Sequence, residues 1–386
     1  MTKNKLIRIT TVPISLDKLL SGQLAFMNRF YKVIGVSSDA AYLEKVGKKE
    51  QIEVFNVEMT RQITPLKDLV AVYKLYRFFK KQKPFIVHTH TPKAGTVGML
   101  AAKLAGVPNR LHTIAGLPLL EATGSKRKLL NFVEKVTYSC ATKIYPNSFG
   151  LNEIIIQEKF CAPDKLKVLG NGSSNGIDTS FFDASHFVPT QNNTLKEELG
   201  ILPDDFVFIF VGRLVADKGI NELVEAFKEL NILLPDTKLV LVGPLETELD
   251  PLLPKTLKEI DVNPAIISVG FQNDVRPYFA IADALVFPSY REGFPNVVMQ
   301  AGAMGLPSIV SNINGCNEII VENYNGMIIP VKNTKAIFEA MKKILEDVIF
   351  YNHLKENSRK RIVDNYEQKV VWEAILNEYK SLENNV

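Results

Sequence analysis

The run Phe206-Val-Phe-Ile-Phe-Val-Gly-Arg-Leu-Val-Ala-Asp-Lys-Gly-Ile-Asn-Glu-Leu-Val-Glu-Ala-Phe227 carries the clearest sign of the architecture. Its first six residues are all apolar, which is typical of a strand buried on both faces of a parallel sheet. After a short loop, apolar residues recur at helical spacing from Ile220. The segment therefore predicts a strand, a loop and an amphipathic helix, the building unit of doubly wound α/β sheets.

The same alternation of short β-branched runs and longer helical patterns continues in both directions along the chain. In the first half the predicted strands are Leu6–Val12, Tyr31–Val36, Glu53–Val57, Phe85–His88, Asn109–Thr113 and Lys143–Pro146. In the second half they are Phe206–Val211, Lys238–Val242, Ile266–Val269, Ala284–Phe287, Pro307–Val310 and Gly326–Ile329. We therefore predict an α/β protein with two Rossmann-like, doubly wound domains.

A turn-rich segment, Asn171–Asp178, follows the strand-like run Lys165–Gly170 and is the expected connector between the domains. We predict an N-terminal domain over residues 1–170 and a C-terminal domain over residues 171–365. A helical apolar stripe within residues 366–386 must bury itself against another part of the protein. We expect this last helix to pack back on the N-terminal domain.

The charge of the chain is divided unevenly between its two parts. The first 170 residues hold 27 Lys and Arg against 12 Asp and Glu, a net charge of about +15, and the remainder is at about −11. A basic domain attracts phosphates, nucleic acids or anionic membrane surfaces. Three scattered cysteines fit neither a disulfide framework nor a zinc site, and no secretion signal or spanning segment is seen. We expect a cytoplasmic protein.

Two cations, Arg213 and Lys218, lie on the loop that follows the strand Phe206–Val211. In open α/β sheets, ligands bind at the carboxyl ends of the strands, and a helix N-terminus there favours anions. A diphosphate would suit this position. The alternative is a pair of solvated surface charges.

The segment Phe287–Val310 offers a second group of candidate residues. Its loop carries Glu292 and Gly293, and a helix is predicted from Asn296. The helix start supplies free backbone N–H groups, and the carboxylate of Glu292 can accept hydrogen bonds from two sugar hydroxyls. Gln300 lies about two helical turns further on. The segment predicts a site for a sugar and a phosphate.

The blocks Gly212-Arg-Leu-x-x-x-Lys-Gly219 and Glu292-Gly-Phe-Pro295, with Gly305-x-Pro307 beyond them, resemble the family 4 glycosyltransferases over essentially the whole chain. These are retaining enzymes of the GT-B fold that take a sugar from a nucleotide diphosphate donor. The resemblance implies two Rossmann-like domains that face each other across a cleft, with the donor bound mainly by the second domain and the acceptor by the first.

Three further segments look most like the bacterial branch that builds capsule, O-antigen and lipid-linked oligosaccharides, a branch that includes lipopolysaccharide synthesis. They are His88–Gly95, Gly170–Asp178 and Arg291–Glu318. This likeness implies a UDP-sugar as donor and a saccharide carried on a polyprenyl diphosphate as acceptor.

The resemblance also implies roles for individual residues. Arg213 and Lys218 would neutralise the leaving diphosphate, and Glu292 would hold hydroxyls of the transferred sugar. Gln300 stands where the family usually has a second acidic residue that binds the ribose, and its amide can still bond hydroxyls. The other implied donor-binding residues are Ser21, Gly22, Gly212, Gly293, Phe294, Pro295 and Asn296. Ser21-Gly22 is expected in the turn before the first helix.

Histidines give one further candidate and no metal site. In Leu111–Gly116, Ala115 occupies the position where many family members have an active-site histidine, so His112 is the only imidazole left there and is the catalytic candidate. We expect His112, Thr113 or the backbone after Ile114 to face the cleft; the alternative is a hydrogen-bonded histidine in a buried strand. His88 and His90 alternate on one strand face without a nearby Cys, Asp or Glu and indicate a strand-end turn. The sequence has no Asp-x-Asp motif, so we expect no metal and no cofactor.

Two helical patterns, Leu66–Phe79 and Leu129–Val136, combine apolar residues with basic flanks. Such helices can lie on an anionic membrane surface, or they can simply face the core with solvated lysines. With the charge of the first half, we expect peripheral attachment at the inner face of the membrane.

The sequence therefore predicts a metal-independent, retaining glycosyltransferase of the hexosyltransferase type that acts in surface polysaccharide synthesis. Two alternatives remain. One is a GT-B enzyme resembling nucleotide-sugar 2-epimerases, and the other is a non-catalytic protein that binds nucleotide sugars or nucleic acid. No nucleic-acid partner is expected, because the chain has no helix-turn-helix or aromatic-basic platform.

Overall fold

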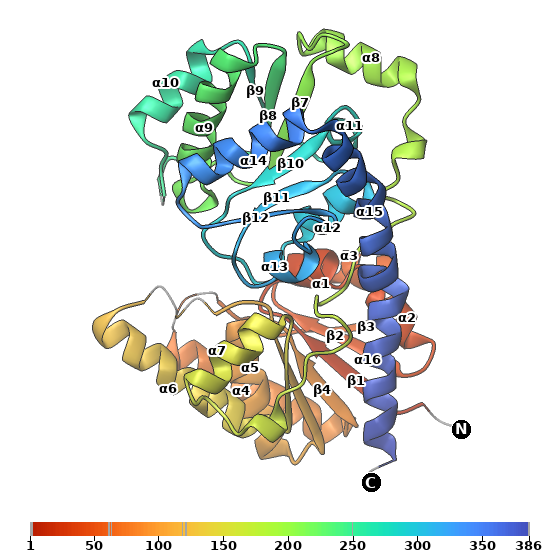
Figure 1. Ribbon diagram of the computed structural model, residues 1–386. Coiled ribbons are helices and arrows are strands. Elements are labelled where there is room, and N and C mark those ends of the chain that lie inside the picture. The colour runs from red at the N-terminus through yellow and green to blue at the C-terminus, as the bar shows by residue number, and fades with distance from the viewer. Residues whose placement is uncertain are drawn as a thin grey trace. The chain divides into compact units, whose positions relative to one another are not determined.

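The computed structural model describes residues 3–384 apart from 61, 63, 118, 120, 121 and 249. The chain divides into two compact units (Figure 1). Unit 1 consists of Met1–Asn175 together with Lys369–Val386, and unit 2 consists of Gly176–Gln368.

Unit 1 is built on a parallel sheet whose strand order is β3-β2-β1-β4-β5-β6. All six strands predicted for the first half are confirmed, with ends that shift by a few residues. They are β1 (Lys5–Ile9), β2 (Lys32–Ser37), β3 (Glu53–Asn56), β4 (Ile86–Thr89), β5 (Asn109–Ile114) and β6 (Lys143–Pro146). Most of their residues are buried on both faces, as a sheet covered by helices on each side requires.

Two sets of helices cover the two faces of this sheet. The helices of unit 1 are α1 (Pro13–Leu19), α2 (Gln23–Asn28), α3 (Ala40–Glu50), α4 (Pro65–Gln82), α5 (Pro92–Ala105), α6 (Gly124–Cys140), α7 (Phe149–Gln157) and α16 (Gln368–Glu383). One core cluster joins the sheet to α1, α2, α3 and α16, and the other joins it to α4, α5, α6 and α7.

The last helix, α16, is part of unit 1 because its apolar stripe completes one of these cores. Val371, Ile375 and Tyr379 are buried there, at most 5% exposed. The indole Nε1 of Trp372 donates to Asn175 Oδ1 at 2.7 Å, and Asn175 Nδ2 donates to the backbone oxygen of Ser21 at 3.0 Å. Because these bonds hold Asn175, unit 1 continues beyond residue 170.

The run Lys165–Gly170, expected as a strand, forms only one isolated bridge, between Leu166 and Ile144. Lys167 N–H donates to the backbone oxygen of Ile144 at 3.0 Å, and the chain then turns into the connector. The expectation of a strand is wrong here, since pairing with β6 ends after this single contact.

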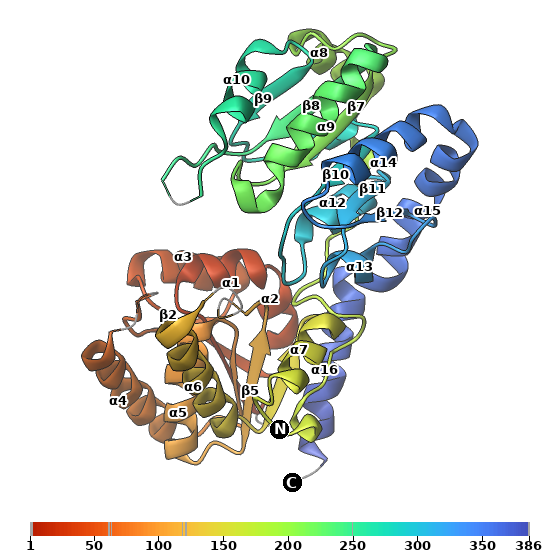
Figure 2. The same ribbon diagram turned by 60° about the vertical axis from the view of Figure 1, so that its left-hand side comes forward.

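Unit 2 repeats the parallel architecture with the strand order β12-β11-β10-β7-β8-β9. The six predicted strands are again confirmed, as β7 (Phe206–Val211), β8 (Thr237–Val242), β9 (Ile266–Gly270), β10 (Ala284–Phe287), β11 (Ser308–Ser311) and β12 (Gly326–Ile329). Its helices are α8 (Pro189–Glu198), α9 (Ile220–Leu233), α10 (Pro254–Val262), α11 (Arg276–Ala280), α12 (Asn296–Ala303), α13 (Cys316–Ile319), α14 (Thr334–Glu346) and α15 (Val348–Tyr366). In Figure 2, α9 can be followed beside α14, and α12 beside α15.

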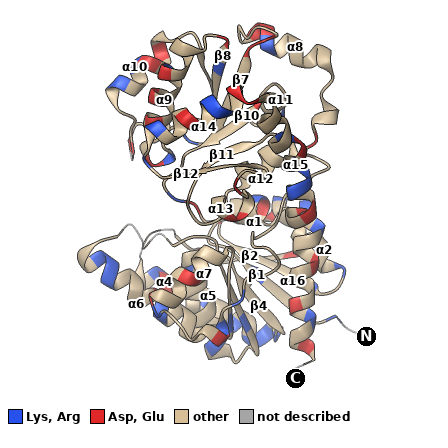
Figure 3. Cartoon of the chain, in the orientation of Figure 1, with Lys and Arg blue, Asp and Glu red and all other residues tan. Residues whose placement is uncertain are grey.

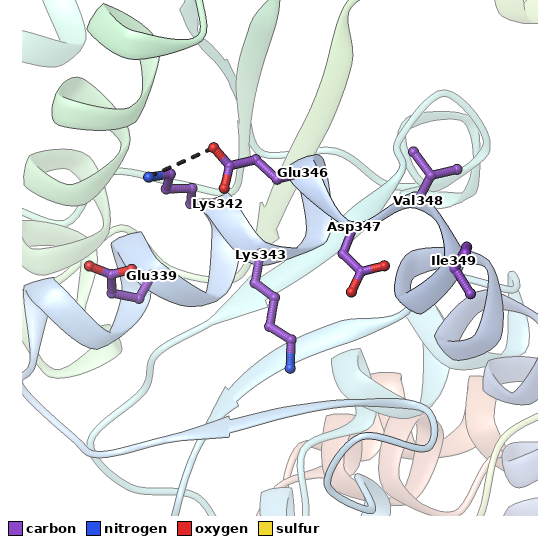
Figure 4. Close-up of a pocket in the computed structure, with 7 residues that line it drawn as sticks. All are labelled: Glu339, Lys342, Lys343, Glu346, Asp347, Val348 and Ile349. Atoms are coloured by element: carbon purple, nitrogen blue, oxygen red, sulfur yellow. Dashed lines mark ion pairs between the residues drawn. The ribbon is translucent and has the colours of Figure 1, made fainter.

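A shallow hollow lies at the junction of α14 and α15 (Figure 4). Its lining residues are Glu339, Lys342, Lys343, Glu346, Asp347, Val348 and Ile349. Asp347 accepts a hydrogen bond from the N–H of Phe350 at 2.9 Å and so caps α15. None of these residues belongs to the motifs singled out in the sequence.

Candidate active site

The candidate active site of unit 2 lies at the carboxyl edge of its sheet, where the strand order reverses. The chain runs from β7 to β8 and β9 on one side and then crosses to β10 on the other side of β7. Open α/β sheets bind ligands at such a switch point, because the loops that leave the two neighbouring strands diverge there. These loops are 212–219 and 288–295, which carry most of the predicted donor-binding residues.

An ion pair joins the two loops. Lys218 ends the short 3-10 turn Ala216–Lys218, and its Nζ contacts Oε1 of Glu292. The two side chains are only 16% and 19% exposed, so the pair is shielded from water but still reachable. Ser289 Oγ donates to the same carboxylate oxygen at 3.3 Å. The structure thus brings together the cation expected at the diphosphate and the carboxylate expected at the sugar.

Arg213 lies on the same loop as Lys218 but is more open. Its Nη1 donates to Glu246 Oε2 at 2.5 Å, and its side chain is 52% exposed. An exposed ion pair of this kind contributes little to stability, so the guanidinium is free to turn toward a ligand. The preceding residue, Gly212, uses its N–H for a 2.9 Å hydrogen bond to the backbone oxygen of Val242. Its amide therefore holds the loop to β8.

Gly219 allows the two loops to approach closely. It has φ +72°, and a Cβ at this position would collide with the backbone oxygen of Pro288. Only glycine accepts both this conformation and this contact without strain. α9 can therefore start directly beside the end of β10.

A second contact supports the loop that carries Glu292. The side-chain amide of Asn314 donates to the backbone oxygens of Glu292 and Gly293, the latter at 3.2 Å. A Cβ on Gly315 would lie 2.6 Å from the Gly293 oxygen, so glycine is needed for the loops to pack. Sequence reasoning did not single out Asn314 and Gly315. Their signal is the polar run Asn312-Ile-Asn-Gly315 at the end of β11.

Further bonds that the sequence did not reveal tie the two loops together. Arg291 Nη2 lies 2.6 Å from Asp217 Oδ2, and the N–H of Tyr290 donates to the backbone oxygen of Asp217 at 2.8 Å. Tyr290 O–H donates to Glu222 Oε1 at 2.7 Å. Burial and this carboxylate raise the pKa of Tyr290, so its hydroxyl stays protonated. The loops are held by contacts on both sides of the Lys218–Glu292 pair.

The helix predicted from Asn296 begins at that residue, as α12. Pro295 precedes it, and no side chain in the described ranges caps this helix end. Its first N–H groups are therefore open to solvent or to an anionic ligand. Phe294 is buried in the core against Tyr366, so only its backbone can face a ligand. Gln300, on α12, is partly exposed, and its side chain has no hydrogen bond to any described residue.

His112 lies on β5 of unit 1, deep under α5. Its Nδ1 is 2.7 Å from Thr89 Oγ1, and the side chain is 3% exposed. A Cβ at Gly95 would run into the ring, so the helix packs directly on the imidazole. Burial lowers the pKa of His112 to about 4. The structure corresponds to the buried, hydrogen-bonded alternative, and we leave His112 out of the proposed catalytic set.

Ser21 and Gly22 do not precede the first helix. They stand between α1 and α2, because the chain forms α1 directly after β1; the expected position is wrong in this respect. The N–H of Gly22 donates to Glu50 Oε1 at 2.9 Å, and a Cβ there would lie 2.8 Å from Trp372. Gly22 thus has a packing reason to be glycine, and its role toward a donor stays a prediction.

His88, on β4, and His90, one residue beyond its end, have ring centroids 4.2 Å apart, as expected for alternate residues of an extended segment. No group of three or more His, Cys, Asp or Glu side chains in the described part of the chain is placed to hold a metal ion. Burial and the nearby Glu292 raise the pKa of Cys316 well above its usual value, so this thiol is an inert core group.

Comparison with known proteins agrees with this geometry. The model of the family "Glycosyl transferases group 1" matches residues 191–361, and that of "Glycosyl transferase 4-like" matches residues 23–148. The first match contains both loops of the candidate active site, and the second covers most of unit 1.

Two relatives that this chain matches over most of their length are also glycosyltransferases. The capsular polysaccharide biosynthesis glycosyltransferase CapM of Staphylococcus aureus is 34% identical over 389 residues, which covers 99% of this chain and 98% of CapM. The UDP-Gal:alpha-D-GlcNAc-diphosphoundecaprenol alpha-1,3-galactosyltransferase of Escherichia coli is 32% identical over 313 residues, which covers 80% of this chain and 78% of that enzyme.

A solved structure shows the same fold. The crystal structure of a glycosyltransferase from Rickettsia africae ESF-5 superimposes with a TM-score of 0.83 over 100% of both chains, at 18% identity. With the two family matches and the relatives above, this confirms the resemblance seen in the sequence motifs: the chain belongs to the family 4 glycosyltransferases and has their GT-B fold.

Proposed function

We propose that this glycosyltransferase moves a sugar from a UDP-sugar to a saccharide linked through diphosphate to a polyprenyl lipid, in the synthesis of a capsule or O-antigen polysaccharide. The observation that carries the proposal is the Lys218–Glu292 pair at the switch point of unit 2, which offers a cation and a hydroxyl-binding carboxylate at one place. The names of the two relatives, one a capsular enzyme and one that uses UDP-Gal and a diphosphoundecaprenol acceptor, support the choice of donor and acceptor.

In the proposed reaction, the bond between the anomeric carbon and the β-phosphate oxygen breaks, and the acceptor hydroxyl forms the new bond to that carbon. Negative charge develops on the departing diphosphate, and Lys218 and Arg213 neutralise it. Preorganised charges of this kind contribute about 3–4 kcal/mol each to lowering a barrier. Because two protein cations supply this stabilisation, we propose that transfer needs no metal ion.

Retention of configuration is part of the proposal and follows from the family resemblance. The acceptor hydroxyl would approach from the face that the leaving phosphate occupies, and its proton would pass to that phosphate. No protein side chain is then required as general base, which is consistent with the burial of His112. The products are the lengthened saccharide and UDP.

Binding of the donor would exchange the partners of Lys218 and Glu292. A bound diphosphate competes with Glu292 for the ammonium group of Lys218, and sugar hydroxyls then replace Lys218 as donors to the carboxylate. Glu292 can serve two hydroxyls, because a carboxylate offers about four acceptor positions. The start of α12 and the amide of Gln300 lie on the same segment and would complete the donor site.

A thermal-shift screen tests this proposal, since a ligand that binds the native state raises its stability by mass action. The protein is heated with UDP, GDP, ADP and their common sugar conjugates, with and without EDTA. We expect a shift with UDP and UDP-sugars that EDTA does not change. A shift with GDP or ADP conjugates only would contradict the donor assignment, and a shift abolished by EDTA would contradict metal-independent binding.

We further propose that α4 of unit 1 rests on an anionic membrane surface. One face of α4 packs in the core through Leu75 and Phe78, as the plain alternative predicted. The opposite face exposes apolar side chains at helical spacing, namely Leu66 (81%), Leu69 (63%), Val70 (55%) and Tyr73 (59%). Exposed Lys67, Lys74 and Arg77 flank them, and Figure 3 shows further basic residues at the start of α6.

An exposed apolar stripe with a cationic rim matches an anionic leaflet in both polarity and charge. No helix in the described ranges is long and apolar enough to cross a membrane. Flotation with vesicles that contain anionic lipid tests the surface contact. We expect Leu69→Glu/Tyr73→Glu to stay at the bottom of the gradient, while Ile232→Glu, on an exposed position of α9, floats like the wild type. Equal flotation of all three proteins would reject the role of α4.

A further inference from the structure

Buried polar atoms without partners gather in a small pocket of unit 1, at the carboxyl ends of β4, β5 and β6. Both ring nitrogens of His90, Oδ1 of Asn147 and Oγ of Ser174 are inaccessible and have no hydrogen-bond partner among the described residues. Buried polar groups in native proteins are nearly always bonded. Several buried polar atoms without partners in one pocket therefore indicate a bound group that forms hydrogen bonds with them.

A chain of hydrogen bonds ends at the same pocket. Arg8 Nη1 donates to the hydroxyl oxygen of Tyr379 at 2.8 Å, and Tyr379 Oη lies 2.5 Å from His88 Nδ1. His88 Nε2 lies 2.7 Å from Oγ1 of Thr113, which lines the pocket. Arginine can only donate, so the single proton of Tyr379 is left for His88 Nδ1. Since a buried O–H is nearly always bonded, Tyr379 donates to Nδ1, and the neutral His88 ring then carries its proton on Nε2 and donates it to Thr113.

The direction of these hydrogen bonds determines whether Thr113 donates or accepts in the pocket. Its Oγ1 already accepts from His88, so its O–H remains to donate to a group in the pocket. Arg8, at the other end, is fully buried, and its hydrogen-bond partners in the described chain are the neutral side chains of Tyr379 and Gln23. A buried cation polarises such a chain of bonds and makes its last hydroxyl a stronger donor.

The donor and acceptor character of the polar atoms in this pocket indicates which chemical group it can bind. Asn147 Oδ1 can only accept a hydrogen bond, whereas Thr113 offers a donor. Burial and the nearby charge of Arg8 lower the pKa of His90, whose neutral ring has one donor and one acceptor nitrogen. A phosphate oxygen could not donate to Asn147, but a hydroxyl both donates and accepts. The free volume, about 10 Å³, suits one hydroxyl group or one water molecule.

We propose that this pocket binds one hydroxyl group of the acceptor saccharide, which accepts from Thr113 and donates to Asn147 Oδ1, with His90 and Ser174 beside it. His88 and Tyr379 are positioning residues that act through Thr113. The choice of a saccharide as the source of the hydroxyl rests on the proposed function; the other source is a buried water.

The hydrogen-bond chain is tested by the tautomer of His88. The protein has five histidines, few enough for their ¹⁵N imidazole signals to be resolved. The His88 signals are those that vanish in His88→Gln. We expect the wild type at neutral pH to carry the proton on Nε2, with Nδ1 unprotonated. Tyr379→Phe removes the donor to Nδ1 and should mix the two tautomers. A wild-type His88 protonated on Nδ1 overturns the proposal.

The ligand is tested by titration calorimetry with N-acetylglucosamine joined through diphosphate to a short alkyl chain, in protein saturated with UDP. Losing one hydrogen bond should weaken binding about tenfold in Asn147→Ala and also in Thr113→Val. Thr113→Ser should restore binding, and Asn152→Ala, on α7 of the same unit, should bind like the wild type.

The outcomes separate this inference from the proposed function. Failure of the wild type to bind UDP counts against the donor site of unit 2. If UDP binds but the saccharide does not, or binds equally to the wild type and all variants, the pocket holds a buried water only and the inference is overturned. Using both Asn147 and Thr113 keeps the test valid if one variant fails to fold.

Discussion

Replacing Lys218 with Met removes the charge that links the two loops of the candidate active site, while it keeps most of the aliphatic stem. The partner carboxylate of Glu292 is only 19% exposed, so it is left partly buried without a cation. Such a pair lies between exposed pairs, worth at most about 1 kcal/mol, and fully buried ones, whose disruption costs about 3–5 kcal/mol. We expect a loss of about 1–2 kcal/mol, which lowers Tm by about 2–8 °C in a domain of this size.

The loss of turnover should be larger than the loss of stability. If Lys218 neutralises the leaving diphosphate, its removal costs about 3–4 kcal/mol in the transition state, or a fall in kcat of about 10²–10³-fold. The assay measures transfer of a radiolabelled sugar to a lipid-linked acceptor at saturating donor, below the Tm of the variant. Lys228→Met is a matched control, because Lys228 pairs with Glu259 on the surface of unit 2.

The double variant Lys218→Met/Glu292→Gln separates the two effects. It leaves no unpaired carboxylate and should regain most of the Tm, but it should not regain turnover. Recovery of kcat together with Tm would show that the pair serves only to hold the loops. A kcat for Lys218→Met within about tenfold of the wild type, less than 1.4 kcal/mol of the barrier, would equally refute the reasoning.

Other expectations are more local. Arg213→Ala should leave Tm unchanged, because the Arg213 side chain is half exposed, but lower kcat about 10²-fold; unchanged kcat would remove it from the site. Glu292→Gln should weaken binding of a UDP-sugar more than binding of UDP, and equal losses in calorimetry would contradict a sugar contact. Because burial lowers the pKa of His112 to about 4, the unfolded chain binds more protons than the native one between about pH 6.5 and 4. The free energy of unfolding should therefore fall by up to about 3 kcal/mol as the pH drops through this window. Urea unfolding of His112→Gln should show a smaller fall over the same pH range.

Strands and helices could be predicted from the sequence because each depends on the pattern of its own residues. Phe206–Val211 is apolar throughout and forms β7, and the periodic run from Ile220 forms α9. The two loops of the candidate active site could be predicted as well, since a parallel sheet brings the carboxyl ends of its strands to one edge. That Lys218 and Glu292 pair directly could not be predicted, because the contact spans 74 residues and depends on β10 pairing with β7.

Contacts between distant segments account for the residues that sequence reasoning missed or misplaced. Asn314 and Gly315 matter because β11 lies beside β10, which no local pattern reveals. The environment of His112 depends on α5, whose Gly95 allows the helix to pack on the ring. Arg8 and Tyr379 are 371 residues apart, so only the folded chain shows the hydrogen bonds that lead to Thr113.

The membership of α16 in unit 1 has a consequence for how the protein is made. Tyr379 supplies a hydrogen-bond partner for the buried Arg8, and Trp372 packs over Gly22, yet both leave the ribosome after the whole of unit 2. Unit 2 is one continuous segment, Gly176–Gln368, whose two ends are joined by hydrogen bonds between Ile177 and the chain around Glu367. Unit 2 can fold before α16 is made, whereas unit 1, most of which is translated earlier, must wait for α16. A stop codon shortly before Lys369 would therefore leave unit 2 intact and damage unit 1, most of which is translated earlier.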